Sequence, residues 1–409
     1  MDDRHSDLRT DPDQPLPGPP DPWSDTDMPS HRAGPPWHMT EMIEAEPALA
    51  ERLLARLADP TSPAAELAEQ IRATAHRRAS IVVTGCGTSE HGAMAVAEIL
   101  RDAMRTAGLP WRVGEGGAPV SAQAFEASLE DELGPGGLVI GISHEGGTWA
   151  TNRSLERARA SGAAIGLLTV TDRSPAAGLA DLVVPTLELD RSWCHTVGYL
   201  APILAATAVG AHLSGRAVPP KAARDVLAAG LAGEAIAATE RVAEDLASLD
   251  RVVTVGSGVD HVAARELALK IEEGAHVAAT ARELETLLHG HLAGMDARTG
   301  VVLVLADARS ADDRLARAQG ALRAAAAIGC RIGVIVGPAY AALLSEDVAT
   351  IAPMATTADL PPPVAALLTT AVPLQVLTER MARVQGVNPD PIRRDDPAYL
   401  RAAEAPSQR

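Results

Sequence analysis

Two short loops in the first half of the chain carry hydroxyl side chains among glycines. One is Gly85-Cys86-Gly87-Thr88-Ser89, and the other is Ser143-His144-Glu145-Gly146-Gly147-Thr148. Each follows an apolar run and precedes a helical pattern, so the free N–H groups of a helix start and the nearby hydroxyls would together hold a phosphate. The same residue types also cap helices without binding a ligand, and either loop alone fits that interpretation equally well. Two such loops in succession favour a ligand site.

The elements that would position these loops are short apolar runs alternating with helical patterns. We expect strands at 80–84, 138–142, 164–170, 182–184, 251–255, 301–305, 331–336 and 349–351. Strands that alternate with helices form parallel sheets, and ligands bind beyond the carboxyl ends of such strands, where both loops lie. The second half repeats the plan of the first. We therefore predict an α/β protein with two tandem, doubly wound, parallel-sheet domains.

Composition shifts mark the domain boundaries. Residues 1–37 are acidic and rich in proline, which predicts a disordered tail. The first domain is expected at 38–215 with a leading helix, and the second at 235–385, joined through a proline-containing link. Residues 386–409 form a C-terminal tail that we expect to contribute to the site.

Composition also excludes several functional classes. The formal net charge is -17, which argues against nucleic acid or an anionic membrane as a partner. No P-loop or G-x-G-x-x-G pattern is present, which disfavours nucleotides. The three widely spaced cysteines, Cys86, Cys194 and Cys330, predict neither a disulfide framework nor a metal site. With no secretory signal and no apolar stretch long enough to span a bilayer, we expect a soluble cytoplasmic protein without a cofactor.

The two hydroxyl loops resemble a known family. Gly85 to Ser89 is similar to the C-G-T-S loop of the sugar isomerase (SIS) domains of glucosamine-6-phosphate synthase, and Ser143 to Thr148 falls where that family carries S-Q-S-G-E-T. The resemblance implies that these loops bind a sugar phosphate. The binding residues carried over are Cys86, Gly87, Thr88, Ser89, Ser143, His144, Gly146 and Thr148. Thr196, with Tyr199, resembles the family's S-T-K-x-F stretch and joins the same set.

A charged helical pattern in the second half carries the candidates for catalysis. Lys270 and Glu273 lie three residues apart and share a helical face, and most pairs with this spacing are surface ion pairs. Here, however, the stretch is similar to the family's E-G-A-L-K-x-K-E and continues without a gap to His289, where the family has K-H-G-P. The resemblance implies proton transfer by Glu273, ring opening by His289, and enolate stabilisation or imine formation by Lys270. It also implies a homodimer, because the family's His reaches the site from a neighbouring subunit.

Departures from the family limit which reaction we expect. Glu145 replaces a hydroxyl residue of the S-Q-S-G-E-T loop and adds a negative charge near the predicted phosphate. We expect no counterpart of the synthase's glutamine-hydrolysing domain, because residues 1–37 form the predicted disordered tail. Residues 388–394 are similar to the family's D-x-P-R-N-L-x-K segment, but with Arg393 on the family's Arg the final Lys falls on Pro397. These differences favour an isomerase or deaminase over an amino-sugar synthase.

Three functions remain open at this point. The first is an enzyme that binds a phosphorylated ketose or amino sugar and moves a proton between C1 and C2, with or without loss of ammonia. The second is a sugar-phosphate sensor without catalysis, which the combination of Lys270, Glu273 and His289 disfavours. The third is an aminotransferase subunit that receives ammonia from a separate glutaminase.

Overall fold

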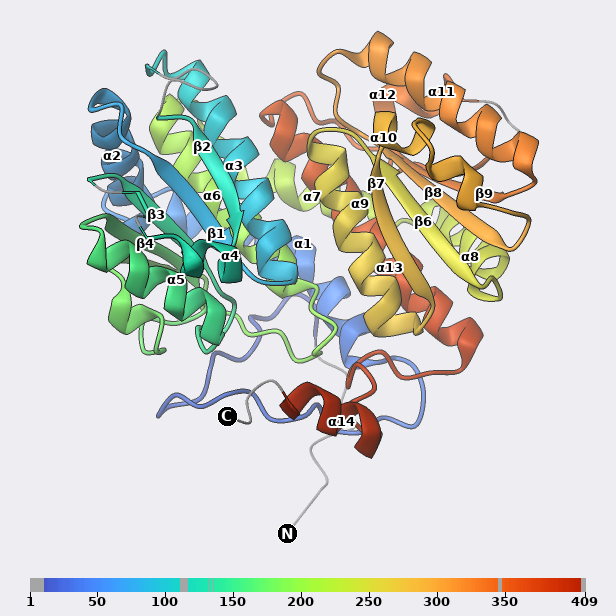
Figure 1. Cartoon of the computed structure of the whole chain (residues 1–409), viewed down its shortest axis with the longest axis horizontal. Coiled ribbons are helices and arrows are strands. Elements are labelled where there is room, and N and C mark those ends of the chain that lie inside the picture. Colours follow the sequence, from blue (N-terminus) through green and yellow to red (C-terminus); the bar gives the residue numbers. More distant parts are fainter. Residues whose placement is uncertain (1–10, 111–116, 132, 135, 345–347, 406–409) are drawn as a thin grey trace.

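The computed structural model describes residues 11–110, 117–131, 133–134, 136–344 and 348–405. Two five-stranded parallel sheets lie side by side, each covered by helices (Figure 1). The strand orders are β2-β1-β3-β4-β5 and β10-β9-β8-β6-β7, so the two sheets share one topology. The predicted pair of doubly wound α/β domains is confirmed.

The first domain contains the following elements: α1 (His38–Leu57), α2 (Pro63–His76), β1 (Ile81–Gly85), α3 (Thr88–Thr106), β2 (Pro119–Gln123), α4 (Ala124–Leu129), β3 (Leu138–Ile142), α5 (Trp149–Ala160), β4 (Ala164–Thr169), η1 (Ala177–Leu179), β5 (Leu182–Pro185) and α6 (Val197–Ser214). The link and the second domain contain α7 (Pro220–Gly230), α8 (Gly233–Ala247), β6 (Arg251–Gly256), α9 (Val259–Lys270), η2 (Ile271–Ala275), β7 (Ala278–Glu283), α10 (Leu284–Leu288), η3 (His291–Gly294), β8 (Thr299–Leu305), α11 (Ala311–Ile328), β9 (Arg331–Val336), α12 (Pro338–Ala341), β10 (Ala349–Ile351), α13 (Pro362–Gln385) and α14 (Pro397–Glu404).

Every strand expected from the sequence forms, but two edge strands were missed. These are β2 in the first sheet and β7 in the second, at equivalent places in the two topologies. Their residues are mostly half-buried or exposed. Because an edge strand packs only partly against the core, it lacks the apolar run by which interior parallel strands are identified.

The turns that follow β1 and β6 have the same backbone geometry. Gly87 precedes α3 with φ 58° and ψ -128°, and Gly258 precedes α9 with φ 60° and ψ -125°. A Cβ on Gly85 or Gly256 would lie 2.3 Å from the carbonyl oxygen of Ser89 or Asp260. Only glycine fits such a turn, and the two domains repeat it residue for residue.

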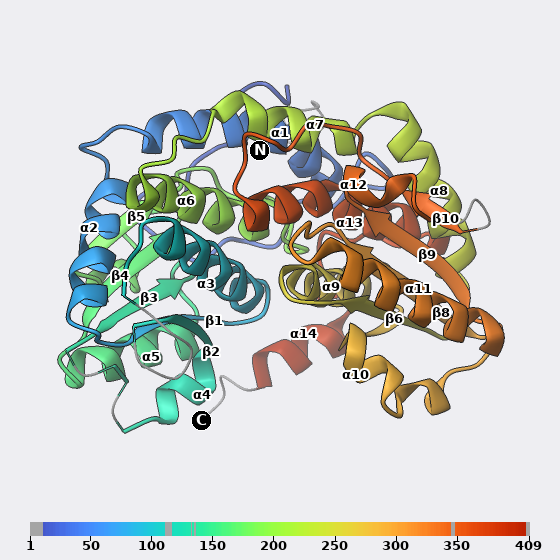
Figure 2. The ribbon, with the colours of Figure 1, turned by 90° about the horizontal axis from the view of Figure 1, so that it is seen from above.

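One hydrophobic core joins the two domains. It extends from Leu16 to Met381 and includes α1, α3, α6, α9 and α13. Helices α3 and α9 face one another between the sheets, and α13 crosses behind them (Figure 2). By length and composition α6 is long and apolar enough to cross a membrane, contrary to the expectation that no stretch is long enough. However, 83% of that window is buried in the protein, which explains its apolar character.

The N-terminal segment differs from the predicted disordered tail. Residues 1–10 lie outside the described residues, but 11–37 run as an extended segment along the lower edge of the first domain (Figure 1). Leu16 is buried in the core, its N–H donates to Glu188, and the carbonyl of Pro17 accepts from the N–H of Leu189. The composition, from which we predicted disorder, does not reveal these specific contacts with the first domain.

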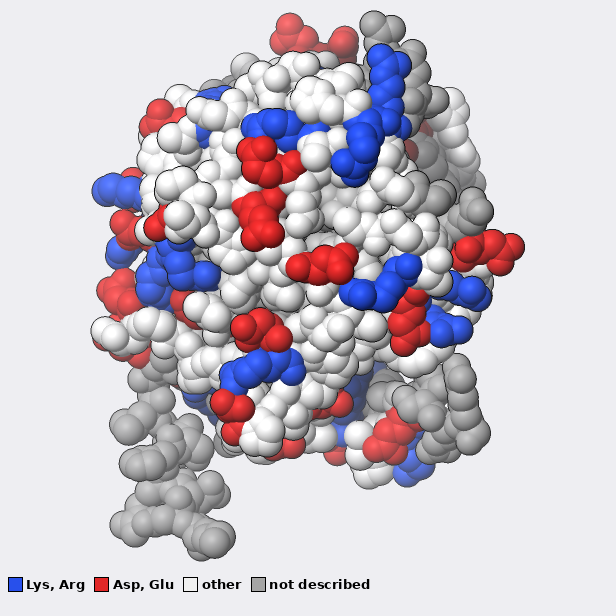
Figure 3. Space-filling view, turned by 90° about the vertical axis from the view of Figure 1, so that its left-hand side faces the viewer, with Lys and Arg blue, Asp and Glu red and all other residues white. Residues whose placement is uncertain are grey.

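Charges of both signs are interspersed on the side of the molecule formed by the first domain (Figure 3). Acidic and basic side chains alternate over this face. A mixed surface of this kind does not create the extended positive field that nucleic-acid binding requires.

Candidate functional site

A cavity of about 640 Å³ opens at the carboxyl ends of β1 and β3, between the two hydroxyl loops. Four other parts of the chain complete it: the N-terminal segment, the loop before α6, the η2 turn and the tail after α13. Its lining residues are Asp25, Thr26, Cys86, Gly87, Thr88, Ser89, His144, Glu145, Gly147, Thr148, Trp193, His195, Gly198, Glu273, Ile392 and Arg394. Most of the predicted binding residues and Glu273 therefore meet in one cavity.

The first loop presents the N-terminus of α3 to this cavity. Thr88 is buried, and its hydroxyl donates to Glu266 of α9 at 3.4 Å, so it links the two domains. Ser89 lines the cavity with a half-buried side chain. Burial and the charge of Glu90 raise the pKa of the Cys86 thiol, which therefore remains protonated near neutral pH. Among the side chains of this loop, Ser89 is the best placed to donate to a ligand.

In the second loop, some predicted residues shape the turn and others face the cavity. Ser143 is buried, and its Oγ accepts from the N–H of Gly146 at 3.1 Å, which closes the turn. Gly146 has φ 85°, and a Cβ there would lie 2.0 Å from the Oγ of Ser174. His144 and Thr148 line the cavity. Ser143 and Gly146 therefore support the loop, while His144 and Thr148 are available to a ligand.

Glu273 reaches the cavity from a π-helical turn, η2, that directly follows α9. Its side chain is 23% exposed, and its Oε2 accepts from the Nζ of Lys270 at 2.5 Å. Extra residues in a helical turn change the direction in which side chains point, and such turns are frequent at functional sites. The predicted spacing of Lys270 and Glu273 thus gives an inward ion pair rather than a surface one.

Lys270 lies behind Glu273 and is fully buried. Its Nζ is also 3.6 Å from Oε1 of Glu266. The other carboxylate oxygen of Glu266, Oε2, is 2.6 Å from Nδ1 of His91 on α3. Burial opposes the charged form of Lys270, but Glu273 and Glu266 outweigh it and raise the pKa of the ammonium above its ordinary value. A charged, enclosed ammonium suits electrostatic stabilisation better than the imine formation that the sequence left open.

His289 does not join the cavity within a single chain. Its side chain is 71% exposed at the end of α10, and its Nε2 lies 2.7 Å from Glu285. Thr196 is also not among the lining residues. It is fully buried, and its N–H donates to Asp190 at 2.7 Å.

A histidine pair that was not predicted as catalytic lies in the cavity wall. The rings of His144 and His195 are 5.2 Å apart, and Nδ1 of His195 lies 3.7 Å from Oδ2 of the fully buried Asp190. The Nε2 of His144 accepts from the N–H of Asp190 at 3.0 Å. This hydrogen bond fixes His144 as the neutral form with its proton on Nδ1.

The pKa values of the two imidazole rings are shifted in opposite directions. Burial, together with His195, lowers the pKa of His144 to about 4. Burial also opposes the charged form of His195, but Asp190 outweighs it and raises the pKa of that ring. Such divergence is typical of an acid–base site. Asp190 and His195 have no recognisable spacing motif, so only the folded chain reveals the pair.

The C-terminal tail reaches the cavity through Ile392 and Arg394. The Arg394 guanidinium lies 5.1 Å from the ring centroid of Trp193, and both residues line the cavity. Arg393, which the sequence comparison aligned with the family's Arg, instead donates to the hydroxyl of Tyr399. The cation at the cavity is therefore Arg394. Residues 406–409 of the tail lie outside the described residues.

The comparisons with known proteins agree with this architecture. No family model matches the chain. It is 26% identical over 375 residues to glutamine–fructose-6-phosphate aminotransferase [isomerizing] of Gloeobacter violaceus, covering 86% of this chain and 56% of the relative. The chain thus spans little more than half the length of that enzyme. The C-terminal domain of glucosamine-fructose-6-phosphate aminotransferase from Francisella tularensis superposes with a TM-score of 0.72 at 19% identity, covering 87% of this chain and 98% of that one.

The fold of the chain matches that of two tandem sugar isomerase domains. Tagatose-6-phosphate ketose/aldose isomerase from Escherichia coli has the same fold, with a TM-score of 0.68 at 18% identity, covering 90% of this chain and 98% of that one. Glucosamine-6-phosphate deaminase from Thermotoga maritima superposes with a TM-score of 0.57 at 17% identity, covering 80% of this chain and 97% of that one.

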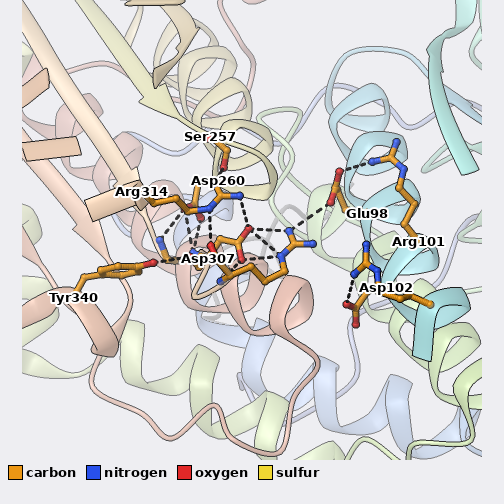
Figure 4. Close-up of polar contacts among 11 residues, drawn as sticks. Glu98, Arg101, Asp102, Ser257, Asp260, Asp307, Arg314 and Tyr340 are labelled. Atoms are coloured by element: carbon orange, nitrogen blue, oxygen red, sulfur yellow. Dashed lines mark hydrogen bonds and ion pairs between the residues drawn. The ribbon is translucent and has the colours of Figure 1, made fainter. Parts of the chain in front are cut away.

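In the second domain, the loop equivalent to the first hydroxyl loop is filled by the protein's own side chains (Figure 4). Asp260, at the start of α9, accepts from the N–H groups of Ala306 and Asp307. Arg314 donates to the carbonyl of Ser257 at 2.6 Å, and its Nη2 is 2.8 Å from the point that a Cβ on Gly258 would occupy. An arginine thus covers the turn in the second domain, whereas the cavity opens at the equivalent turn of the first.

Proposed function

We propose that the chain is an enzyme that binds a phosphorylated ketose or amino sugar in the first-domain cavity and moves a proton between C1 and C2. The observation that carries the proposal is the position of Glu273. Glu273 lines the same cavity as the hydroxyl loops, and its carboxylate accepts from the buried ammonium of Lys270. The named activities of the similar proteins, an aldose–ketose isomerase, a deaminase and an isomerizing aminotransferase, are consistent with this reaction type.

Each step needs a group that this arrangement supplies. A carboxylate removes the proton from the carbon beside the carbonyl, which is the role of Glu273. The charge that develops on the enediolate oxygen is stabilised by the nearby cation, Lys270. The N-terminus of α3, with Ser89, and Thr148 at the start of α5 supply donors for the phosphate.

Opening of the sugar ring requires a second proton carrier, and two histidines compete for this role. His195 faces the cavity within the same chain and is supported by Asp190. His289 would act only from a neighbouring subunit of a homodimer, as the family resemblance implies, because it is exposed and lies outside the cavity of its own chain.

Mixing inactive variants distinguishes the two histidines. If His289 acts across subunits, dissociating and reassociating Glu273→Gln with His289→Gln will restore part of the activity, because some mixed dimers contain one intact site. If His195 is the carrier, His289→Gln will keep near-normal turnover, and His195→Gln will lose the limb of the pH–rate profile that belongs to the ring-opening group.

The overall reaction is tested with a panel of hexose and hexosamine phosphates, following ammonia release and aldose–ketose interconversion. We expect turnover of at least one compound without added glutamine. An enzyme that makes amino sugar only when ammonia is supplied would instead be the aminotransferase subunit. If no compound turns over while one raises the melting temperature, the chain is a sugar-phosphate sensor.

A further inference from the structure

The N-terminal segment is hydrogen-bonded to the second hydroxyl loop. Trp23 Nε1 donates to the carbonyl of Glu145 at 3.0 Å, and Thr26 donates to Oε2 of Glu145 through both its N–H, at 2.8 Å, and its hydroxyl, at 2.6 Å. Asp21 forms an ion pair with Arg173 nearby. Residues 21–27, which we call the docked segment, are therefore fixed to the loop by several contacts.

Gly147 provides the space that this docking needs. A Cβ at this position would lie 2.6 Å from Oδ1 of Asp25 and 3.3 Å from the indole of Trp23. Any larger residue would therefore require the side chains of Asp25 and Trp23 to shift. Glu145 and Gly147 are two of the three positions at which the loop departs from S-Q-S-G-E-T, and both departures serve this contact.

The docking also determines where negative charge lies. The Oε2 atom of Glu145 accepts both hydrogen bonds from Thr26, which hold this carboxylate against the docked segment. Asp25, in contrast, lines the cavity. Among the residues that the structure describes, its carboxylate has no hydrogen-bond or ion-pair partner. A free carboxylate at a cavity wall accepts from hydroxyls, attracts an ammonium and repels a phosphate.

We propose that the docked segment is a wall of the substrate cavity and that Asp25 is a specificity-determining residue. Its carboxylate selects amino sugar phosphates over other sugar phosphates by attracting their ammonium group. The inference rests on the proposed function, because it assumes that the cavity takes a sugar phosphate. The phosphate lies away from Asp25, toward the N-terminus of α3 and Arg394. The sugar's amino group lies against the docked segment.

Binding measurements on the full chain test this inference directly. Isothermal titration compares glucosamine 6-phosphate with glucose 6-phosphate for the wild type, Asp25→Asn and Asp27→Asn. Asp27 is the matched control, because it is an exposed carboxylate of the same segment that does not line the cavity. We expect Asp25→Asn to weaken the binding of glucosamine 6-phosphate about five- to tenfold without weakening the binding of glucose 6-phosphate. Asp27→Asn should change neither affinity.

A second variant tests the docking without changing Asp25. Trp23→Phe combined with Thr26→Val removes two of the three hydrogen bonds to Glu145, and we expect faster hydrogen exchange in residues 21–27 and a reduced preference for the amino sugar. An unchanged preference in both variants overturns the inference, as does a chain that binds neither compound. A chain that discriminates between the two by binding but catalyses no reaction contradicts the proposed function alone.

Discussion

At the scale of single residues, Lys270 combines a structural role with the proposed catalytic one. Its ammonium is enclosed with two carboxylates, Glu266 and Glu273, and Glu266 is itself fully buried. Removing one member of a buried charge group leaves the other charges uncompensated, which costs far more than losing an exposed pair. The sequence predicted the pair from its spacing, but not that it would be enclosed.

We therefore predict that Lys270→Met lowers the free energy of unfolding by about 3–5 kcal/mol. Chemical denaturation measures the effect. The control is Lys221→Met, which breaks the exposed Lys221–Asp225 pair and should change stability by less than about 1 kcal/mol. Equal effects from the two substitutions would contradict the enclosed-charge description.

His144 should make stability depend on pH in the acid range. Its pKa is lowered from 6.5 to about 4, so between these values the unfolded chain binds a proton that the native protein does not. Stability contributed by neutral His144 is thus present above pH 6.5 and lost as the pH falls toward 4. As the pH falls between these values, the wild type loses free energy of unfolding through this group. We predict that His144→Gln loses up to about 3 kcal/mol less of its free energy of unfolding over the same range. Parallel stability curves for the two proteins would refute this assignment.

At the scale of elements, the strand-to-helix turns position the chemistry. The turn after β1 brings Thr88 and Ser89 to the start of α3, and its equivalent after β6 is closed by Arg314. Because a Cβ on Gly256 would lie 2.3 Å from the carbonyl oxygen of Asp260, the second turn tolerates only glycine. The requirement is purely steric, so it can be tested without a ligand.

We predict that Gly256→Ala destabilises the protein by more than about 2 kcal/mol, because backbone must shift to admit the methyl group. Gly233→Ala is the matched control. Gly233 begins α8 with open space around it, so alanine should be neutral or stabilising. Thermal denaturation of both variants gives the comparison, and an unperturbed Gly256→Ala would show that the turn is not so confined.

The elements also show how far the sequence alone could predict the site. Interior strands and the two hydroxyl loops follow from local patterns, because burial on both faces selects apolar, β-branched runs. The π-helical turn that directs Glu273, the approach of His144 to Asp190 and the docking of residues 21–27 all depend on contacts between distant segments. No periodicity records such contacts, so these features became visible only in the folded chain.

At the scale of the whole molecule, the two domains share one hydrophobic core. Helices α3 and α9 pack together, and Thr88 and His91 of one domain contact Glu266 of the other. The cavity depends on this arrangement, because the hydroxyl loops come from the first domain and Glu273 from the second.

Because the core is continuous, we predict that both domains unfold in one cooperative transition. Differential scanning calorimetry should give a single endotherm whose calorimetric enthalpy equals the van't Hoff enthalpy. Two resolved transitions would mean that the domains are independent, and the cavity between them would then form only when they associate.

The most direct test of the whole account is proton exchange at the sugar carbon. In deuterated water, NMR should show the wild type incorporating solvent deuterium at C1 or C2 of a hexose or hexosamine 6-phosphate. Glu273→Gln should slow the incorporation about 10²- to 10⁴-fold, while Glu272→Gln, the exposed neighbouring carboxylate, leaves it unchanged. Equal incorporation by the wild type and Glu273→Gln would contradict the assignment of Glu273 as the base, and no incorporation by the wild type would contradict the proposed reaction itself.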